Sequence, residues 1–333
     1  MEIRNNVILA PYTTFRIGGP ARYFVEVGSI EELRNAANFS KENNLRFFIL
    51  GGGSNILVSD KGFNGLVIKM EIKGLEFKNE KDYSILSVGA GESWDYVVEQ
   101  AVSRNLGGIE NLSLIPGTAG AAVYQNIGAY GVELKDVLES VEVLDVGSGE
   151  IKNFLNMDCR FGYRDSIFKN KDDLIVLKVN FKLLKNSKPN IQYPDLVKFF
   201  ESKGPAISDI RQAIIEIRRS KLPYPDEIGN AGSFFKNPVI SETKFKNLIG
   251  SHPDLKEFNS GGGLVKLSAA QLIEKCGWKG KACGNVGVSE KHSLVLVNHG
   301  KGTAEEIIDL AEDIKRAVKN EFGVKLEPEV EVI

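Results

Sequence analysis

Two glycine-rich segments constrain this chain more than any other feature of its sequence. The run Gly51-Gly52-Gly53 follows a predicted strand at 46–50, and Gly117 and Gly120 lie in a second segment, 115–122. Glycine has no Cβ atom and tolerates positive φ, so the backbone at such runs can turn sharply and approach another group closely. Glycine makes up 34 of the 333 residues without any repeat, against about 7 % in average proteins. We therefore expect these glycines to serve specific turns and binding loops.

The composition excludes several classes of protein. The 42 Lys and Arg residues are balanced by 44 Asp and Glu residues, so the net charge of −2 leaves no basic excess for nucleic-acid binding. Three cysteines are too few and too odd in number for a disulfide framework. The N-terminus lacks a signal-peptide pattern, and no apolar run approaches the roughly 20 residues of a membrane span. We expect a cytoplasmic protein that binds neither nucleic acid nor membrane.

Periodicity and capping signals predict a mixture of strands and helices. A strand–helix–strand unit comes first, at 22–27, 29–43 and 46–50, and Ser29 with Glu32 forms a capping box at the start of its helix. Further strands are predicted at 66–70, 83–88, 137–146, 173–184, 294–297 and 324–333, and further helices at 93–105, 209–219, 268–277 and 303–323. The sequence Lys221-Leu222-Pro223-Tyr224-Pro225 interrupts this pattern and indicates a domain boundary.

The glycine segments are the first candidates for a binding site. Successive small residues after a strand can turn several backbone N–H groups toward one anion, although the run 51–53 alone also fits a tight turn. Two such segments together suggest a long phosphate-bearing ligand such as a dinucleotide. Gly89-Ala90-Gly91 resembles a dinucleotide fingerprint, but Trp94 occupies the position where a third glycine is needed. We interpret that segment as a strand-to-helix turn.

Several common chemistries have no support in the sequence. Neither H-E-x-x-H nor C-x-x-C occurs, and the three histidines lack metal-ligand spacing, so we expect no metal site. Three polar residues stand in unusual settings, namely Arg164, Ser233 and Glu329. Each also has an ordinary interpretation: a surface ion pair with Asp165, a turn hydroxyl and a solvent-facing strand residue, respectively. The pattern alone does not decide between these interpretations and catalysis.

Four motifs in order carry a family resemblance. They are Gly-Gly-Gly-Ser-Asn-Ile-Leu-Val-Ser-Asp at 51–60, Ile-Pro-Gly-Thr-Ala-Gly-Ala-Ala-Val-Tyr-Gln-Asn-Ile-Gly-Ala-Tyr-Gly at 115–131, Tyr-Arg-Asp-Ser at 163–166 and Gly-Asn-Ala-Gly-Ser-Phe-Phe-Lys-Asn-Pro at 229–238. With these motifs, the chain resembles the UDP-N-acetylenolpyruvoylglucosamine reductase (MurB) family from Thr13 to Val330.

The resemblance implies an α+β fold with two parts. The first is a two-lobed FAD-binding module of the vanillyl-alcohol-oxidase (PCMH) type at 1–220, with lobes of about 1–69 and 70–220. The second is a C-terminal α+β substrate domain at 221–333, whose last strand, 324–333, returns to the first lobe. The implied activity is the NADPH-dependent, FAD-mediated reduction of UDP-N-acetylglucosamine enolpyruvate to UDP-N-acetylmuramate in peptidoglycan precursor synthesis.

Motif matching also assigns roles to individual residues. Arg164 would bind the enolpyruvyl carboxylate, Ser233 would protonate the intermediate, and Glu329 would assist, with Glu327 as the alternative to Glu329. The residues expected to bind FAD are Gly51, Gly52, Gly53, Ser54, Asn55, Pro116, Gly117, Thr118, Gly120, Ala121, Asn126 and Gly128. Those expected to contact substrate or NADPH are Tyr193, Lys221 and Asn237.

Two further expectations concern the cofactor and the alternatives. Relatives of this flavin fold often attach FAD through a histidine, and residues 1–251 contain none, so we expect non-covalent FAD. A monomer is the default expectation. The competing hypotheses are an FAD-dependent oxidase of a small alcohol or sugar, and a non-catalytic protein that binds a sugar nucleotide.

Overall fold

The computed structural model describes residues 1–171, 173–200, 204–259 and 261–333. These residues form two compact units, and neither is one continuous stretch. The first unit consists of Met1–Val7, Ala21–Gly52 and Asn64–Arg219. The second consists of Ile8–Pro20, Gly53–Phe63 and Ser220–Ile333. Two N-terminal segments therefore belong with the C-terminal residues, an arrangement that no local signal in the sequence indicates.

The first unit is built on two sheets. One has the strand order β1-β2-β5-β3 and the other the order β11-β10-β12-β7-β6. The strands are β1 (Arg4–Ile8), β2 (Pro20–Val27), β3 (Phe47–Leu50), β5 (Phe63–Met70), β6 (Leu75–Asn79), β7 (Tyr83–Gly89), β10 (Leu138–Asp145), β11 (Ile151–Leu155) and β12 (Leu174–Leu184), with a small hairpin of β8 (Gly128–Ala129) and β9 (Val132–Glu133). The helices are α1 (Ile30–Glu42), α2 (Trp94–Val102), α3 (Ala119–Tyr124), α4 (Pro194–Phe200) and α5 (Ile207–Lys221).

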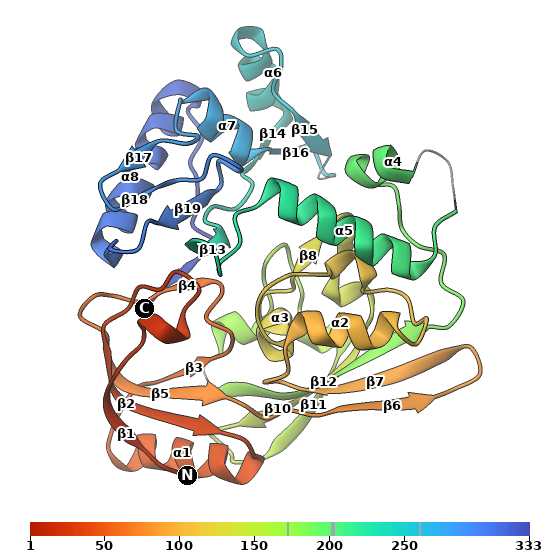
Figure 1. Cartoon of the computed structure of the whole chain (residues 1–333), viewed down its shortest axis with the longest axis vertical. Coiled ribbons are helices and arrows are strands. Elements are labelled where there is room, and N and C mark those ends of the chain that lie inside the picture. The colour runs from red at the N-terminus through yellow and green to blue at the C-terminus, as the bar shows by residue number, and fades with distance from the viewer. Residues whose placement is uncertain (172, 201–203, 260) are drawn as a thin grey trace. The chain divides into compact units, whose positions relative to one another are not determined.

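One apolar core joins the two sheets with helices α1, α2 and α3, whereas α4 and α5 share a separate small cluster. Helices α2 and α3 lie along one face of the five-stranded sheet (Figure 1). The fully buried Trp94 at the start of α2 packs edge-on against Phe181 of β12, with ring centroids 5.7 Å apart. Helix α1 contributes Leu33 and Ala36 to the same core. Ser29 caps α1 as expected, accepting from the Glu32 N–H, whereas the Glu32 carboxylate accepts from the N–H of Gly28.

Within the described residues, the second unit carries three small sheets and three α-helices. The sheets have the orders β13-β19-β18-β17, β14-β16-β15 and β20-β4. The strands are β4 (Ile56–Leu57), β13 (Gly229–Ser233), β14 (Val239–Ser241), β15 (Glu257–Asn259), β16 (Leu264–Leu267), β17 (Ala282–Cys283), β18 (Val286–Val288), β19 (Val295–Asn298) and β20 (Glu331–Val332), and the helices are α6 (Glu242–Ser251), α7 (Ala269–Lys275) and α8 (Ala304–Phe322). Their shared core includes Phe15, Ile17 and Leu57 from the two N-terminal segments.

The expected final strand at 324–333 is wrong in its extent. Only Glu331 and Val332 form β20, which pairs in parallel with β4. Before it, Pro328 makes an isolated bridge with Phe235. Proline has no N–H group and cannot donate to a continuous ladder, which explains why the strand is interrupted there. The buried side chains of Leu326 and Val330 anchor this irregular segment in the core instead.

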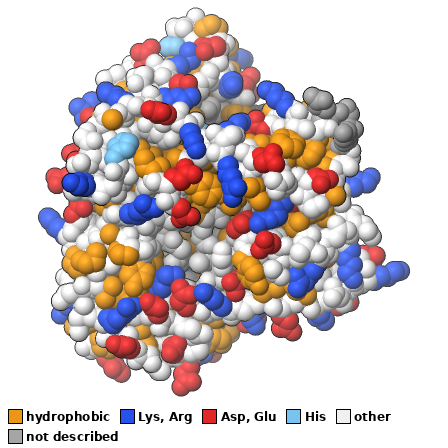
Figure 2. Space-filling view, viewed as in Figure 1, with side chains coloured by type: hydrophobic (Ala, Val, Ile, Leu, Met, Phe, Trp, Pro, Cys, Tyr) orange, Lys and Arg blue, Asp and Glu red, His pale blue; other side chains and the backbone are white. Residues whose placement is uncertain are grey.

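Within the described residues, no helix is both long enough and apolar enough to cross a membrane. On the face that Figure 2 shows, Lys and Arg side chains lie interspersed with Asp and Glu side chains. This surface agrees with the near balance of charges in the sequence.

Helix α8 has three of its first four backbone N–H groups satisfied by side chains. Thr303 and Glu306 form a capping box. The Asp60 carboxylate, from a segment 244 positions away, accepts from the N–H groups of Ala304 and Glu305 at 2.9 and 3.1 Å. This long-range cap attaches the N-terminal segment of the second unit to its longest helix.

We predict that Thr303→Ala lowers the free energy of unfolding by about 1 kcal/mol, because the N–H of Glu306 loses its acceptor. A urea titration of the purified protein measures this difference. Thr303→Ser keeps a hydroxyl acceptor and serves as the control. An unchanged unfolding midpoint in the alanine variant would contradict the capping role.

Candidate active site

The two glycine segments that the sequence singled out lie against each other in the first unit. A Cβ atom on Gly52 would lie 2.7 Å from the Cα of Gly117, and one on Gly51 would lie 2.8 Å from Thr118 Oγ1. Real Cβ atoms essentially never come within 3.0 Å of another non-bonded heavy atom, so a side chain at Gly52 would displace backbone and one at Gly51 would displace the Thr118 side chain. The backbone just after β3 and the backbone just before α3 therefore lie in direct contact.

Thr118 adds an unsatisfied polar atom to this backbone surface. Its hydroxyl is buried and has no hydrogen-bond partner among the described residues. Buried hydroxyls are nearly always paired, so an exception calls for an explanation. An unpaired hydroxyl beside side-chain-free backbone fits a bound polar group such as the phosphates or the ring edge of FAD.

Gly120 has a different environment. Its N–H donates to the carbonyl of Ala90 at 2.9 Å, and the N–H of Ala119 donates to that of Glu92 at 2.9 Å. A Cβ on Gly120 would lie 2.9 Å from the Cβ of Ala90. Protein carbonyls therefore use the first amides of α3, and glycine at 120 allows the helix to pack on the turn after β7. That turn leads from Gly89 into α2, as the interpretation of this segment as a strand-to-helix turn predicted.

Arg164 is positioned by the hairpin of β8 and β9. Its Nη2 donates to the carbonyl of Gly128 at 2.7 Å, and its guanidinium lies 5.4 Å from the ring centroid of Tyr163. The backbone of Arg164 has φ of +55°, an uncommon conformation for this residue type. Lys169 Nζ donates to the Arg164 carbonyl. These contacts fix a half-buried arginine in a strained turn, which is typical of a functional residue.

Asn126 supports the same hairpin. It is fully buried, its Nδ2 donates to the carbonyl of Gly162 at 2.9 Å, and its Oδ1 accepts from the N–H of Lys135. Its side chain therefore holds the segment before Arg164 against the hairpin. The structure gives Asn126 a clear role in shaping this region.

Tyr193 packs against Tyr130, the residue at the tip of the hairpin. The two ring centroids lie 5.2 Å apart at 75°, and Tyr193 is 37 % exposed. Burial raises the pKa of Tyr130, although the nearby Arg218 acts in the opposite direction. Buried Asn111 donates to the carbonyls of both Tyr130 and Asn190, each at 2.9 Å, and so joins the hairpin to the segment before Tyr193. Sequence reasoning passed over Asn111, and its only signal was its place just before the second glycine segment.

Ser233 lies at the end of β13 in the second unit. Gly232 before it has φ of +68°, and the β13–β19 register shifts there, so the strand bulges at this point. After Ser233, the buried side chains of Phe234 and Phe235 stack edge-on with centroids 5.1 Å apart. The bulge and the two aromatic anchors hold the half-buried Ser233 in a defined position.

The segment that carries Glu329 runs beside Ser233. The N–H of Glu329 donates to the carbonyl of Phe234 at 2.8 Å, and the N–H of Lys236 donates to that of Glu327 at 2.9 Å. Glu329 is half-buried and Glu327 is exposed. Two of the three candidate catalytic residues, nearly 100 positions apart in the sequence, are thus brought together by backbone pairing.

The remaining candidates in the second unit have distinct settings. Asn237 Oδ1 accepts from the N–H of Ala269 at 3.0 Å, the first residue of α7. Lys221 is the exposed last residue of α5.

Burial, followed by the charges of Lys279 and Lys221, lowers the pKa of His292, which therefore stays neutral at neutral pH. Sequence reasoning set His292 aside with the other histidines, and nothing in the local pattern indicated this burial.

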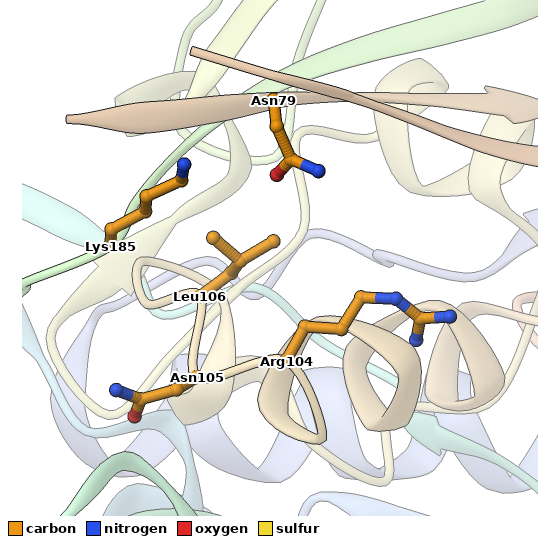
Figure 3. Close-up of a pocket in the computed structure, with 5 residues that line it drawn as sticks. All are labelled: Asn79, Arg104, Asn105, Leu106 and Lys185. Carbon is orange, nitrogen blue, oxygen red and sulfur yellow. The ribbon is translucent and has the colours of Figure 1, made fainter. Parts of the chain in front are cut away.

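A separate hollow of about 490 Å³ lies in the first unit. Its lining residues are Asn79, Arg104, Asn105, Leu106 and Lys185 (Figure 3). Arg104 is already engaged by Gln100 and Ser103 and lies over the ring of Phe77. None of the predicted site residues lines this hollow. In the described part of the chain, no cluster of three His, Cys, Asp or Glu side chains could hold a metal ion.

Comparison with known proteins decides the family. Two family models match this chain. The model described as "UDP-N-acetylenolpyruvoylglucosamine reductase, C-terminal domain" matches residues 223–333, and the model described as "FAD binding domain" matches residues 21–154. The UDP-N-acetylenolpyruvoylglucosamine reductase of Flavobacterium johnsoniae is 42 % identical and covers 100 % of both chains. That of Pseudomonas aeruginosa is 42 % identical over 99 % of this chain and 98 % of its own. This chain belongs to the UDP-N-acetylenolpyruvoylglucosamine reductase family.

A solved structure supports the same assignment. The reductase of Thermus caldophilus superposes with a TM-score of 0.72 at 28 % identity, covering 100 % of this chain and 99 % of that one. The expected α+β fold, with an FAD-binding region followed by a family-specific C-terminal domain, is confirmed. The expected FAD cofactor and flavin oxidoreductase class are confirmed as well.

We predict that Gly52→Ala reduces the FAD content of the purified protein by tenfold or more, because the new methyl group would push the two glycine segments apart. The ratio of flavin absorbance to protein absorbance measures this content. Gly28→Ala is the matched control, since its Cβ would meet nothing closer than 3.7 Å. Equal flavin content in the two variants would contradict the close approach described above.

Proposed function

We propose that this chain reduces UDP-N-acetylglucosamine enolpyruvate to UDP-N-acetylmuramate with NADPH as the electron donor, as a step of peptidoglycan precursor synthesis. Full-length similarity to named reductases supports the reaction. The observation that carries the mechanism is the backbone pairing of the Ser233 segment with the Glu329 segment. It brings a proton-bearing hydroxyl and a carboxylate into one region of the second unit.

When bound, FAD would supply the hydride chemistry that links NADPH to the enolpyruvyl double bond. Hydride addition leaves negative charge on the adjacent carbon and its carboxylate. Arg164 would bind that carboxylate, since a guanidinium forms strong, charge-assisted hydrogen bonds with it. The contact of Nη2 with the Gly128 carbonyl fixes the guanidinium beforehand, so little reorganisation is needed.

Ser233 would deliver the proton to the carbon that carries this charge. A serine hydroxyl is a weak acid in water, so it must be held close to a strongly basic carbanion to act. The bulge at Gly232 and the anchors Phe234 and Phe235 provide this restraint. We assign the assisting carboxylate to Glu329 in preference to Glu327, because Glu329 is half-buried and hydrogen-bonded on both sides of its backbone.

The other candidate residues would bind rather than react. Tyr193, Lys221 and Asn237 would contact the sugar nucleotide or NADPH. Eleven residues from the two glycine segments and the adjoining hairpin would hold FAD non-covalently: Gly51, Gly52, Gly53, Ser54, Asn55, Pro116, Gly117, Thr118, Ala121, Asn126 and Gly128. Gly120, whose N–H already donates to the Ala90 carbonyl, would instead allow α3 to pack beside this site. We further propose that the protein acts as a monomer in the cytoplasm.

The direct test is NADPH consumption by the purified, FAD-loaded protein. We expect rapid oxidation only when UDP-N-acetylglucosamine enolpyruvate is present. Oxidation that depends on oxygen and ignores the substrate would instead support a flavin oxidase. Substrate binding without any NADPH oxidation would support a non-catalytic binding protein.

We predict that Ser233→Ala slows the oxidation of reduced flavin by substrate by about 10²–10⁴-fold, the usual contribution of a general acid. Reduction of the flavin by NADPH should continue near its original rate. Stopped-flow absorbance of the flavin follows each half-reaction separately. An equal loss in both would show that Ser233 has a structural role only.

A further inference from the structure

Asn55 makes two hydrogen bonds to the segment that carries Glu329. Its Nδ2 donates to the carbonyl of Glu329 at 3.0 Å, and its own carbonyl accepts from the N–H of Glu331 at 3.1 Å. Asn55 and Glu329 lie 274 positions apart in the sequence. Immediately after Asn55, Ile56 and Leu57 of β4 pair in parallel with β20. Asn55 thus stands where this pairing begins.

Two hydrogen bonds hold the backbone of Glu329, one at its N–H group and one at its carbonyl group. Its N–H group donates to the carbonyl of Phe234, and its carbonyl accepts from the Asn55 side chain. The Phe234 contact relates Glu329 to the Ser233 segment. The Asn55 contact relates it to the run 51–55, which follows β3. Because β20 is only two residues long, these two bonds, together with the buried side chain of Val330, fix the backbone at Glu329.

We propose that Asn55 is a positioning residue for Glu329. Its amide fixes the backbone from which the Glu329 carboxylate projects, and it links the ordering of the glycine run to the placement of that carboxylate. This inference rests on the proposed function, in which Glu329 assists protonation. A misplacement of about 1 Å can slow a reaction by about 10²-fold, so one such restraint has a measurable effect.

A double-mutant cycle on the substrate half-reaction tests the link. We expect Asn55→Ala, measured at saturating FAD, to slow flavin oxidation by substrate by about tenfold to a hundredfold. Flavin reduction by NADPH should change far less. Glu329→Gln combined with Asn55→Ala should be no slower than Glu329→Gln alone. Fully additive effects, or an equal loss in both half-reactions, would overturn the proposal.

Two further variants separate positioning from cofactor binding. Ser54→Ala alters the neighbouring residue of the same run. If this substitution weakens only FAD binding, it should slow flavin reduction and flavin oxidation to the same extent. Asn55→Asp keeps the shape of the side chain but replaces the N–H donor with a carboxylate oxygen. We expect Asn55→Asp to reproduce the selective loss of Asn55→Ala. Normal substrate kinetics in Asn55→Asp would overturn the proposal.

Amide hydrogen exchange gives a readout that needs no turnover. In FAD-saturated Asn55→Ala, the amides of Glu329 and Glu331 should exchange at least several-fold faster than in the unsubstituted protein. Unchanged exchange would overturn the proposal. If the unsubstituted protein fails to oxidise NADPH with substrate, the proposed function fails, yet exchange still decides whether Asn55 holds this strand.

Discussion

The second unit depends on one constraint: residues 55–57, just after the glycine run, pair with residues 329–332 near the C-terminus. Strand β4 pairs with β20, Asn55 holds the carbonyl of Glu329, and Asp60 caps helix α8. The same N-terminal segments place Phe15, Ile17 and Leu57 in the core of the second unit. The sequence predicted a C-terminal domain at 221–333. The corresponding compact unit also includes Ile8–Pro20 and Gly53–Phe63 from the N-terminal part of the chain.

The glycines divide into two physical classes. Gly51 and Gly52 allow two backbone segments to touch, and this close approach leaves a polar, side-chain-free surface beside the unpaired hydroxyl of Thr118. Gly120 allows a helix to pack on the turn at Ala90, and its amide is already used within the protein. A glycine cluster thus indicates that backbone segments approach closely, and the structure shows which segment each glycine approaches.

Local signals predicted several of the longer elements, including strands β10 and β12, but missed helices α3, α4 and α6 and many short strands. Helices α1, α2, α5 and α8 lie close to their expected ranges, because capping residues and apolar periodicity are properties of the sequence nearby. The final strand was too long in the prediction because the predicted range ran through Pro328, whose missing N–H group interrupts the ladder. The neighbourhood of Ser233 and Glu329 was also beyond local reasoning, since it arises from pairing between distant segments. Arg164 has a contact with Gly128 that its ordinary interpretation, an ion pair with Asp165, did not include.

We propose above that this chain adds one hydride and one proton across the enolpyruvyl double bond. Mass spectrometry of the product, after anaerobic incubation of equimolar NADPH and UDP-N-acetylglucosamine enolpyruvate with the FAD-loaded protein, tests it most directly. We expect a sugar nucleotide heavier than the substrate by two hydrogen atoms, formed in step with NADPH loss. Recovery of the substrate at its original mass, with NADPH either retained or oxidised, would contradict the account.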